Sequence, residues 1–135
     1  MKKRILLLCV VSAAFICLNL QSNTAKAQSK FYVAYGEVSF LEPDDYGYEY
    51  EDEDFISNVF EVKCPTTPNL EKSIETQFNK YLKTTPYQKF GDCRVRFLYA
   101  REFSTRERAE TFRKRRLMWE DDIITFYDFD FNCAK

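Results

Sequence analysis

Histidine is absent from this 135-residue sequence. Its absence excludes serine–histidine and cysteine–histidine catalysis, and it removes the usual ligands of zinc hydrolases. Glycine is also scarce: the whole chain has three, and they form neither a phosphate-binding loop nor a dinucleotide-binding pattern. We therefore expect no enzyme of these common classes and no bound cofactor.

Long apolar runs are confined to the start of the chain, over residues 5–20. A basic stretch precedes this run, and Ala25-Lys26-Ala27 follows it with the small-x-small pattern that signal peptidase cleaves. Residues 1–27 therefore resemble a bacterial export signal that is removed before Gln28. A run of about 16 apolar residues is short for a membrane span, which needs about 20. An uncleaved anchor and a lipid anchor at Cys17 are the alternatives.

Residues 28–135 are enough for one small domain. The signal holds four of the 20 basic residues and none of the 21 acidic ones, so the rest of the chain has 16 basic residues and a net charge of −5. This acidity, together with export, argues against a nucleic-acid partner. Abundant phenylalanine and tyrosine can fill a core. We expect a single exported domain in the periplasm or outside the cell, with no membrane span after cleavage.

Two spacings of apolar residues, every second residue and every fourth residue, predict the secondary structure. Apolar residues alternate over 31–42, 57–64, 93–102 and 123–131, which predicts four strands. Leu70, Ile74, Phe78 and Leu82 recur every four residues, which predicts an amphipathic helix that begins after Thr67. Residues 104–107, Ser-Thr-Arg-Glu, match a capping box and predict a second helix that ends near residue 116.

The order of these elements is β-β-α-β-α-β, which predicts an α+β fold. Polar residues alternate along the second and third strands, so we do not expect a sheet that is buried on both faces. The prediction is a two-layer sandwich, in which a mixed sheet of about four strands carries both helices on one face. Strands joined through a helix are expected to run parallel.

Three cysteines remain after cleavage: Cys64, Cys93 and Cys133. An oxidising compartment favours one disulfide and leaves one thiol. Cys64 and Cys133 each follow one of the expected parallel strands, so they should meet at the same rim of the sheet. Cys64–Cys133 is therefore the preferred pair, and Cys64–Cys93 is the alternative. The thiol left over is expected to be buried and unreactive.

The most acidic stretch has eight carboxylates between Glu42 and Asp54 and is expected to form a hairpin tip. Tyr46, Tyr48 and Tyr50 lie within it, and tyrosine together with acid suits a basic protein partner. Calcium is an alternative ligand, because it prefers several oxygen ligands. Its weak candidates are Asp44, Asp45, Asp52 and Asp54, whose spacing does not match an EF-hand loop.

Two other charged groups have simpler interpretations. The basic residues between Arg106 and Arg116 are expected to form a solvated helix face, neutralised in part by the acidic tip, and an anion site is the alternative. Asp128 and Asp130 could act as an acid–base pair in sugar hydrolysis, but they are expected to lie on the wet side of a strand.

The resulting hypothesis is a small exported protein that binds a partner and has no catalytic activity. Its interaction surface is predicted to be the acidic tyrosine-rich hairpin or the sheet face that the helices leave open. A calcium-dependent structural module of the envelope and a small carboxylate-dependent hydrolase are the alternatives.

Overall fold

A computed structural model describes residues 29–133. The predicted export signal, residues 1–27, lies outside the described part of the chain, so its prediction stays open. Within residues 29–133, no helix is long and apolar enough to cross a membrane.

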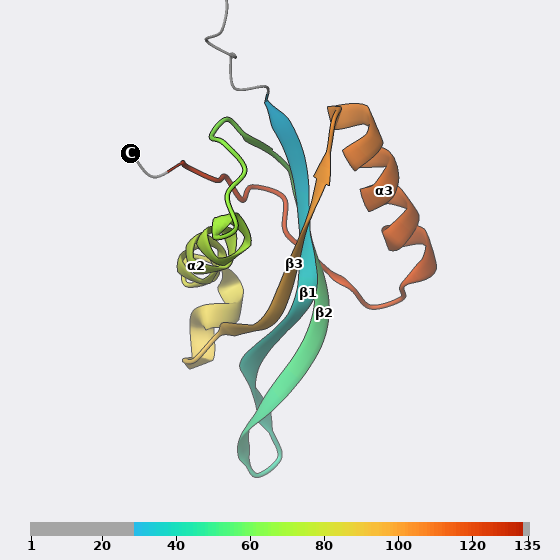
Figure 1. Cartoon of the computed structure of the whole chain (residues 1–135). Coiled ribbons are helices and arrows are strands. Elements are labelled where there is room, and N and C mark those ends of the chain that lie inside the picture. The colour runs from blue at the N-terminus through green and yellow to red at the C-terminus, as the bar shows by residue number, and fades with distance from the viewer. Residues whose placement is uncertain (1–28, 134–135) are drawn as a thin grey trace, which may run out of the picture.

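A four-stranded mixed sheet is the centre of the fold (Figure 1). Its strands are β1 (Lys30–Asp44), β2 (Gly47–Val62), β3 (Arg94–Phe103) and β4 (Ile124–Thr125), in the spatial order β3-β1-β2-β4. β1 runs antiparallel to both β2 and β3, and β4 runs parallel to β2. The predicted α+β class, mixed sheet and element order are confirmed.

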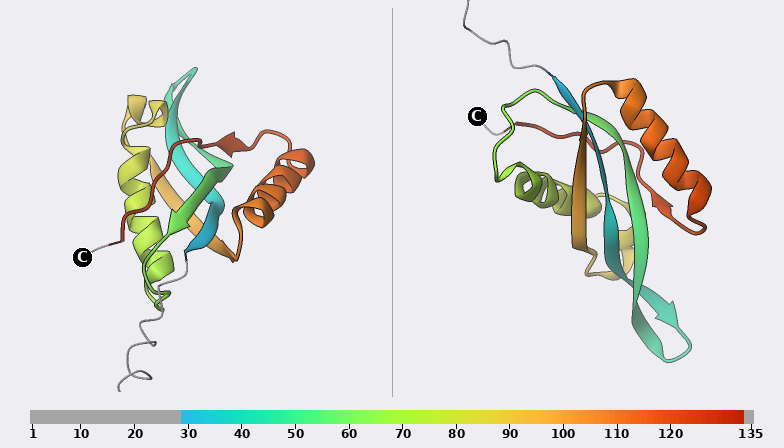
Figure 2. Two further views of the ribbon diagram at one scale, coloured as in Figure 1. Left: turned by 90° about the horizontal axis from the view of Figure 1, so that it is seen from above. Right: turned by 45° about the vertical axis from the view of Figure 1, so that its right-hand side comes forward.

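The two long helices lie on opposite faces of this sheet (Figures 1 and 2). α2 (Leu70–Leu82) covers one face, and α3 (Arg106–Trp119) covers part of the other. The prediction of both helices on one face is wrong. The connection from β2 to β3 crosses the sheet in one direction, and the connection from β3 to β4 crosses back. Two crossovers of the same hand that run in opposite directions place their helices on opposite faces.

The larger core lies between the sheet and α2. The predicted stripe of α2 is fully buried there, against even-numbered residues of β1 such as Tyr32 and Ala34. Phe78 is at its centre, with its ring 4.8 Å from that of Phe55 and 4.9 Å from that of Phe129. The helix begins two residues later than predicted, after Asn69, and the short helix η1 (Pro86–Phe90) follows it.

A smaller core lies under α3. Val33, Ile56 and Val59 from the sheet meet Ala109, which is the only residue of α3 that is fully buried. The N-cap of this helix is Thr105 and not Ser104, because the hydroxyl of Thr105 accepts a hydrogen bond from the backbone N–H of Arg108 at 3.3 Å. Arg108, and not Glu107, is therefore the third residue of the helix, so the predicted capping box does not form.

The final segment, residues 126–133, differs from the predicted strand. Only β4 pairs regularly with β2, and the side-chain amides of Asn58 and Gln77 then each make two hydrogen bonds with the backbone, at Phe129 and Asn132 respectively. These amides take the place of a strand ladder, so strict alternation is lost. Phe126, Phe129 and Phe131 are buried, whereas Tyr127 is exposed.

A disulfide joins the end of this segment to the end of β2. Cys64 and Cys133 form it with a Cα–Cα distance of 5.7 Å, and this is the pair that the sequence analysis prefers. Cys93 keeps a free thiol that is buried in the larger core, so the alternative Cys64–Cys93 pair does not form.

Candidate functional site

The most prominent surface feature is the distal end of the β1–β2 hairpin. β3 pairs with β1 only as far as Ser39, and β1 and β2 then continue as a two-stranded ribbon to the turn at Asp45 and Tyr46. We call residues 40–51 the arm. It projects away from the sheet and from both helices (Figures 1 and 2). The predicted acidic tip is therefore regular strand almost to its end.

The arm is uniformly acidic. It holds five carboxylates and no basic residue, and Glu42 and Glu49 lie directly opposite each other in the register. Like charges opposite each other on a strand pair are destabilising. Among the described residues, no basic side chain forms an ion pair with any of the five. The arm therefore presents a concentrated, uncompensated negative charge.

The tyrosines of the arm become more exposed toward its tip. Tyr50 has 49% of its surface exposed, Tyr48 has 64%, and Tyr46 in the turn has 99%. Exposed tyrosine supplies both apolar area and a hydroxyl, which is why it is enriched in protein interfaces. The predicted partner-binding residues therefore share one accessible projection.

The base of the arm is held in place by the start of β3. The guanidinium of Arg94 lies 5.8 Å from the ring centre of Tyr50, whose hydroxyl is 3.4 Å from Asp92. Two residues further along β3, Arg96 forms ion pairs with Asp52 and Glu37. These contacts fix the direction of the arm at its base.

The calcium candidates are not gathered at one point. Asp44 lies opposite Gly47, whereas Asp52 lies opposite Ser39, five residues back along β1. Five residues of strand span roughly 17 Å, far more than two ligands of one ion can be apart. Asp52 is also paired with Arg96. In residues 29–133, no three acidic or cysteine side chains are arranged to hold a metal ion.

A second charged surface lies between β3 and α3. A groove of about 590 Å³ is lined by Arg101 and Phe103 from β3 and by Arg108, Phe112 and Arg115 from α3. We call it the arginine groove. The guanidinium of Arg101 lies 4.8 Å from the ring centre of Phe112. In the described part of the chain, none of these three arginines forms an ion pair.

The arginine groove shows that the basic run is not a uniform solvated face. Arg106 and Arg116 each form an ion pair with a glutamate one turn later, and Arg113 donates to the backbone of Ser57. Among the described residues, Arg108 and Arg115 line the groove without an ion pair, and Arg108 donates only to the hydroxyl of Ser104, at 3.5 Å. The basic residues therefore divide into a structural set and an unneutralised set.

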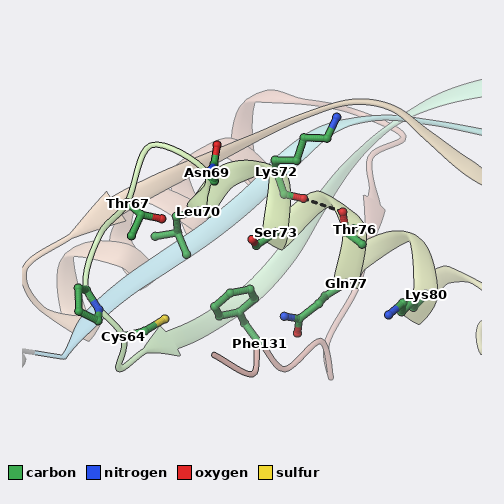
Figure 3. Close-up of a pocket in the computed structure, with 11 residues that line it drawn as sticks. Cys64, Thr67, Asn69, Leu70, Lys72, Ser73, Thr76, Gln77, Lys80 and Phe131 are labelled. Atoms are coloured by element: carbon green, nitrogen blue, oxygen red, sulfur yellow. Dashed lines mark hydrogen bonds between the residues drawn. The ribbon is translucent and has the colours of Figure 1, made fainter. Parts of the chain in front are cut away.

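A third hollow follows the outer side of α2 beside the disulfide (Figure 3). Its volume is about 510 Å³, and its lining is mostly hydroxyl, amide and lysine side chains, among them Ser73, Gln77 and Lys80. Thr76 donates its hydroxyl proton to the backbone carbonyl of Lys72 within it. Within residues 29–133, no carboxylate lines this hollow and its one cysteine, Cys64, is in the disulfide, so the hollow offers neither a carboxylate pair nor a free thiol.

The remaining reactive groups are held in unreactive states. Burial, with the nearby carboxylate of Asp92, raises the pKa of the Cys93 thiol to about 11, so it is protonated at neutral pH. Asp128 is exposed and accepts a hydrogen bond from Tyr81. Burial and this hydrogen bond raise the pKa of Tyr81 above its usual value. Asp130 is also exposed and lies in a separate small hollow beside Glu61.

α3 covers part of the sheet face that was predicted to stay open as a second interaction surface. On this face Phe97 and Tyr99 of β3 remain 44% and 55% exposed. A bulge in β3 places these two rings on this face. Glu37 pairs with Phe97, whereas Val38 pairs with Val95, so Arg96 is an extra residue. The extra residue changes which side chains point to the larger core, a signal that the sequence pattern does not carry.

Comparisons with known proteins add no family to this description. No protein-family model, no curated protein and no solved structure matches the chain. The arm and the arginine groove therefore have to be interpreted from their own chemistry.

Proposed function

We propose that this protein is a small exported binding protein without catalytic activity, and that the arm is its binding element. The partner surface is basic. The observation that carries the proposal is the opposed pair Glu42 and Glu49 in a ribbon that has no basic residue and ends in the fully exposed Tyr46.

The energetics of the arm support this proposal. An isolated two-stranded ribbon is marginally stable, and opposed like charges weaken it further. Among residues 29–133 no ion pair offsets that cost, but a basic partner surface removes it on binding. Charge complementarity of this kind accelerates association and selects among partners. Tyr48 and Tyr50 alternate with Glu49 and Glu51, so they lie on the other face of the ribbon and add apolar area for a partner that encloses the arm.

The charge of the arm also has a role in the unbound protein. A two-stranded ribbon has unpaired backbone groups along both edges and is prone to pair with other strands. Acidic side chains along those edges oppose strand pairing between arms. Solubility alone needs the charges but not the row of exposed tyrosines, and this difference makes the proposal testable.

The test replaces Tyr46, Tyr48 and Tyr50 by serine and compares the capture of envelope proteins by this variant and by the wild type. The matched control is Tyr127→Ser, which removes a tyrosine that is 73% exposed and lies outside the arm. We expect the triple variant to lose capture and the control to keep it, with unchanged circular dichroism for both. Equal capture by the wild type and the triple variant would refute the proposal.

A further inference from the structure

We infer that the basic surface recognised by the arm is the arginine groove of a second copy of this chain. This inference rests on the proposed function and names its partner. It implies that the protein assembles head to tail, with each arm inserted between β3 and α3 of the next molecule.

The charges of the two surfaces are complementary, and within residues 29–133 neither the carboxylates of the arm nor the arginines of the groove form an ion pair. The arm has five carboxylates and no basic residue, and the arginine groove has three arginines with Glu107 as its only acidic lining residue. Three cations and one carboxylate leave the groove with a net positive charge, which favours the approach of further anions. An acidic ribbon supplies several anionic groups at once.

The arm cannot reach the groove of its own molecule. Phe31 and Val33 of β1 pair with Phe103 and Arg101, so the groove lies beside the first residues of that strand. The arm begins at Phe40. Phe40 is seven residues beyond Val33 along the continuous strand β1, which corresponds to about 23 Å. Pairing of the two surfaces therefore requires two molecules.

The dimensions of the two surfaces are similar. Carboxylates on one face of the arm extend from Asp44 to Glu51, which lies opposite Phe40, over roughly 13 Å of strand. Arg108 and Arg115 are seven residues apart on one side of α3, about 10.5 Å along the helix axis. Several carboxylates of the arm can therefore lie within reach of both arginines together.

The aromatic residues reinforce this match. In the groove, the guanidinium of Arg101 already stacks on Phe112 and on Phe103, at 4.8 Å and 5.6 Å. An arginine surface with aromatic neighbours accepts a further ring by stacking and cation–π contact. Tyr46, at the end of the arm and 99% exposed, is the ring best placed to enter.

The type of assembly follows from the fact that the contact joins two different surfaces, the arm of one molecule and the arginine groove of the next. Because the arm and the groove are different surfaces, the interface is heterologous, and repeated use of it gives a ring or an open chain. A molecule that lacks either half can join one neighbour only. This property provides a direct test.

The experiment uses two variants of the mature protein. The arm variant carries Glu42→Gln, Glu49→Gln and Glu51→Gln, and it keeps its groove. The groove variant carries Arg108→Gln and Arg115→Gln, and it keeps its arm; Arg101 is retained because it packs on the core rings. A control variant carries Lys72→Gln and Lys80→Gln on the exposed side of α2. Circular dichroism checks the fold of each one.

Sedimentation velocity at low salt, over a range of concentrations, measures the assemblies. We expect the average mass of the wild type and of the control to rise with concentration and to return to the monomer mass at high salt. Each of the other two variants stays monomeric alone. Their equimolar mixture forms a species of twice the monomer mass and nothing larger, because the only intact arm and the only intact groove pair once.

Two outcomes overturn the inference: a mixture that remains monomeric, and arm and groove variants that each associate as the wild type does. The first outcome, combined with loss of envelope-protein capture by the tyrosine variant, leaves the proposed function standing with a different basic partner. Unchanged capture by the tyrosine variant refutes the proposed function itself. The two failures are therefore distinguishable.

Discussion

Removal of the Cys64–Cys133 disulfide is expected to cost a large share of the stability of this domain. The bridge joins residues 69 positions apart. In the chain-entropy model, a loop of that length restricts the unfolded chain by about 4 kcal/mol. Small domains have a total unfolding free energy of about 5–15 kcal/mol. The variant Cys64→Ala/Cys133→Ala should therefore fold, but with a much lower urea midpoint.

The assay is urea denaturation followed by far-ultraviolet circular dichroism. Fluorescence is less suitable, because Trp119 is 85% exposed in the folded protein and its environment changes little on unfolding. Opening the loop also expands the unfolded chain, so the denaturant m-value should rise. Cys93→Ala is the control, since it removes a buried thiol without opening a loop.

A loss below about 1 kcal/mol, the size of an ordinary point mutation, would refute this reasoning. It would mean that the amide contacts of Asn58 and Gln77, with the buried rings of Phe129 and Phe131, hold the final segment without the bridge. In that case the unfolded chain would already be restricted, or the disulfide would strain the folded state enough to offset its benefit.

Three further predictions concern separate parts of the molecule. Gly36→Ala should destabilise the sheet by more than about 1 kcal/mol in urea denaturation, because an added Cβ would lie 2.1 Å from the carbonyl oxygen of Phe97; a neutral substitution would show that β3 can move away. For Cys93, the pKa is about 11 in the fold against 9.0 for a free thiol, so the folded state holds the proton more tightly. Stability should be constant below pH 9 and should fall between pH 9 and 11, with a shallower fall in Cys93→Ala; equal slopes would contradict a buried thiol. Calcium and chelator should give the same melting temperature, since Asp44 and Asp52 are too far apart to share an ion; a higher value with calcium would contradict the arm geometry.

The sequence was sufficient for the elements whose pattern has a single physical cause. The four-residue repeat from Leu70 to Leu82 predicted α2, and the alternation in residues 31–40 correctly assigned the odd and even residues of β1 to separate faces. Both features depend on burial in one element alone. Parallel strands also placed Cys64 and Cys133 on the same rim, where the structure joins them.

The features that the sequence did not reveal depend on contacts between elements. The bulge at Arg96 exposes Phe97 and Tyr99, and it is visible only once β3 is paired with β1. Asn58 replaces strand pairing by side-chain hydrogen bonds, which alternation cannot express. The side of the sheet that α3 covers is set by the direction of its crossover.

The same limit applies to the candidate site. Composition alone located the acidic tyrosine-rich stretch, but not the ribbon that carries it beyond the sheet. The arginine groove could not be predicted, because Arg101 comes from β3 and its neighbours Arg108 and Arg115 come from α3. Their common location depends on how α3 packs on the sheet.

The unequal burial of the two helices divides the molecule into parts of different resistance to local unfolding. α2 buries four apolar side chains completely, and the disulfide lies at the end of the same layer. α3 fully buries Ala109 alone. Its release would leave the larger core intact, so the backbone amides of α3 should exchange with solvent through a sub-global opening well below the energy of complete unfolding. One wall of the arginine groove is therefore the part of the domain that can move without the rest.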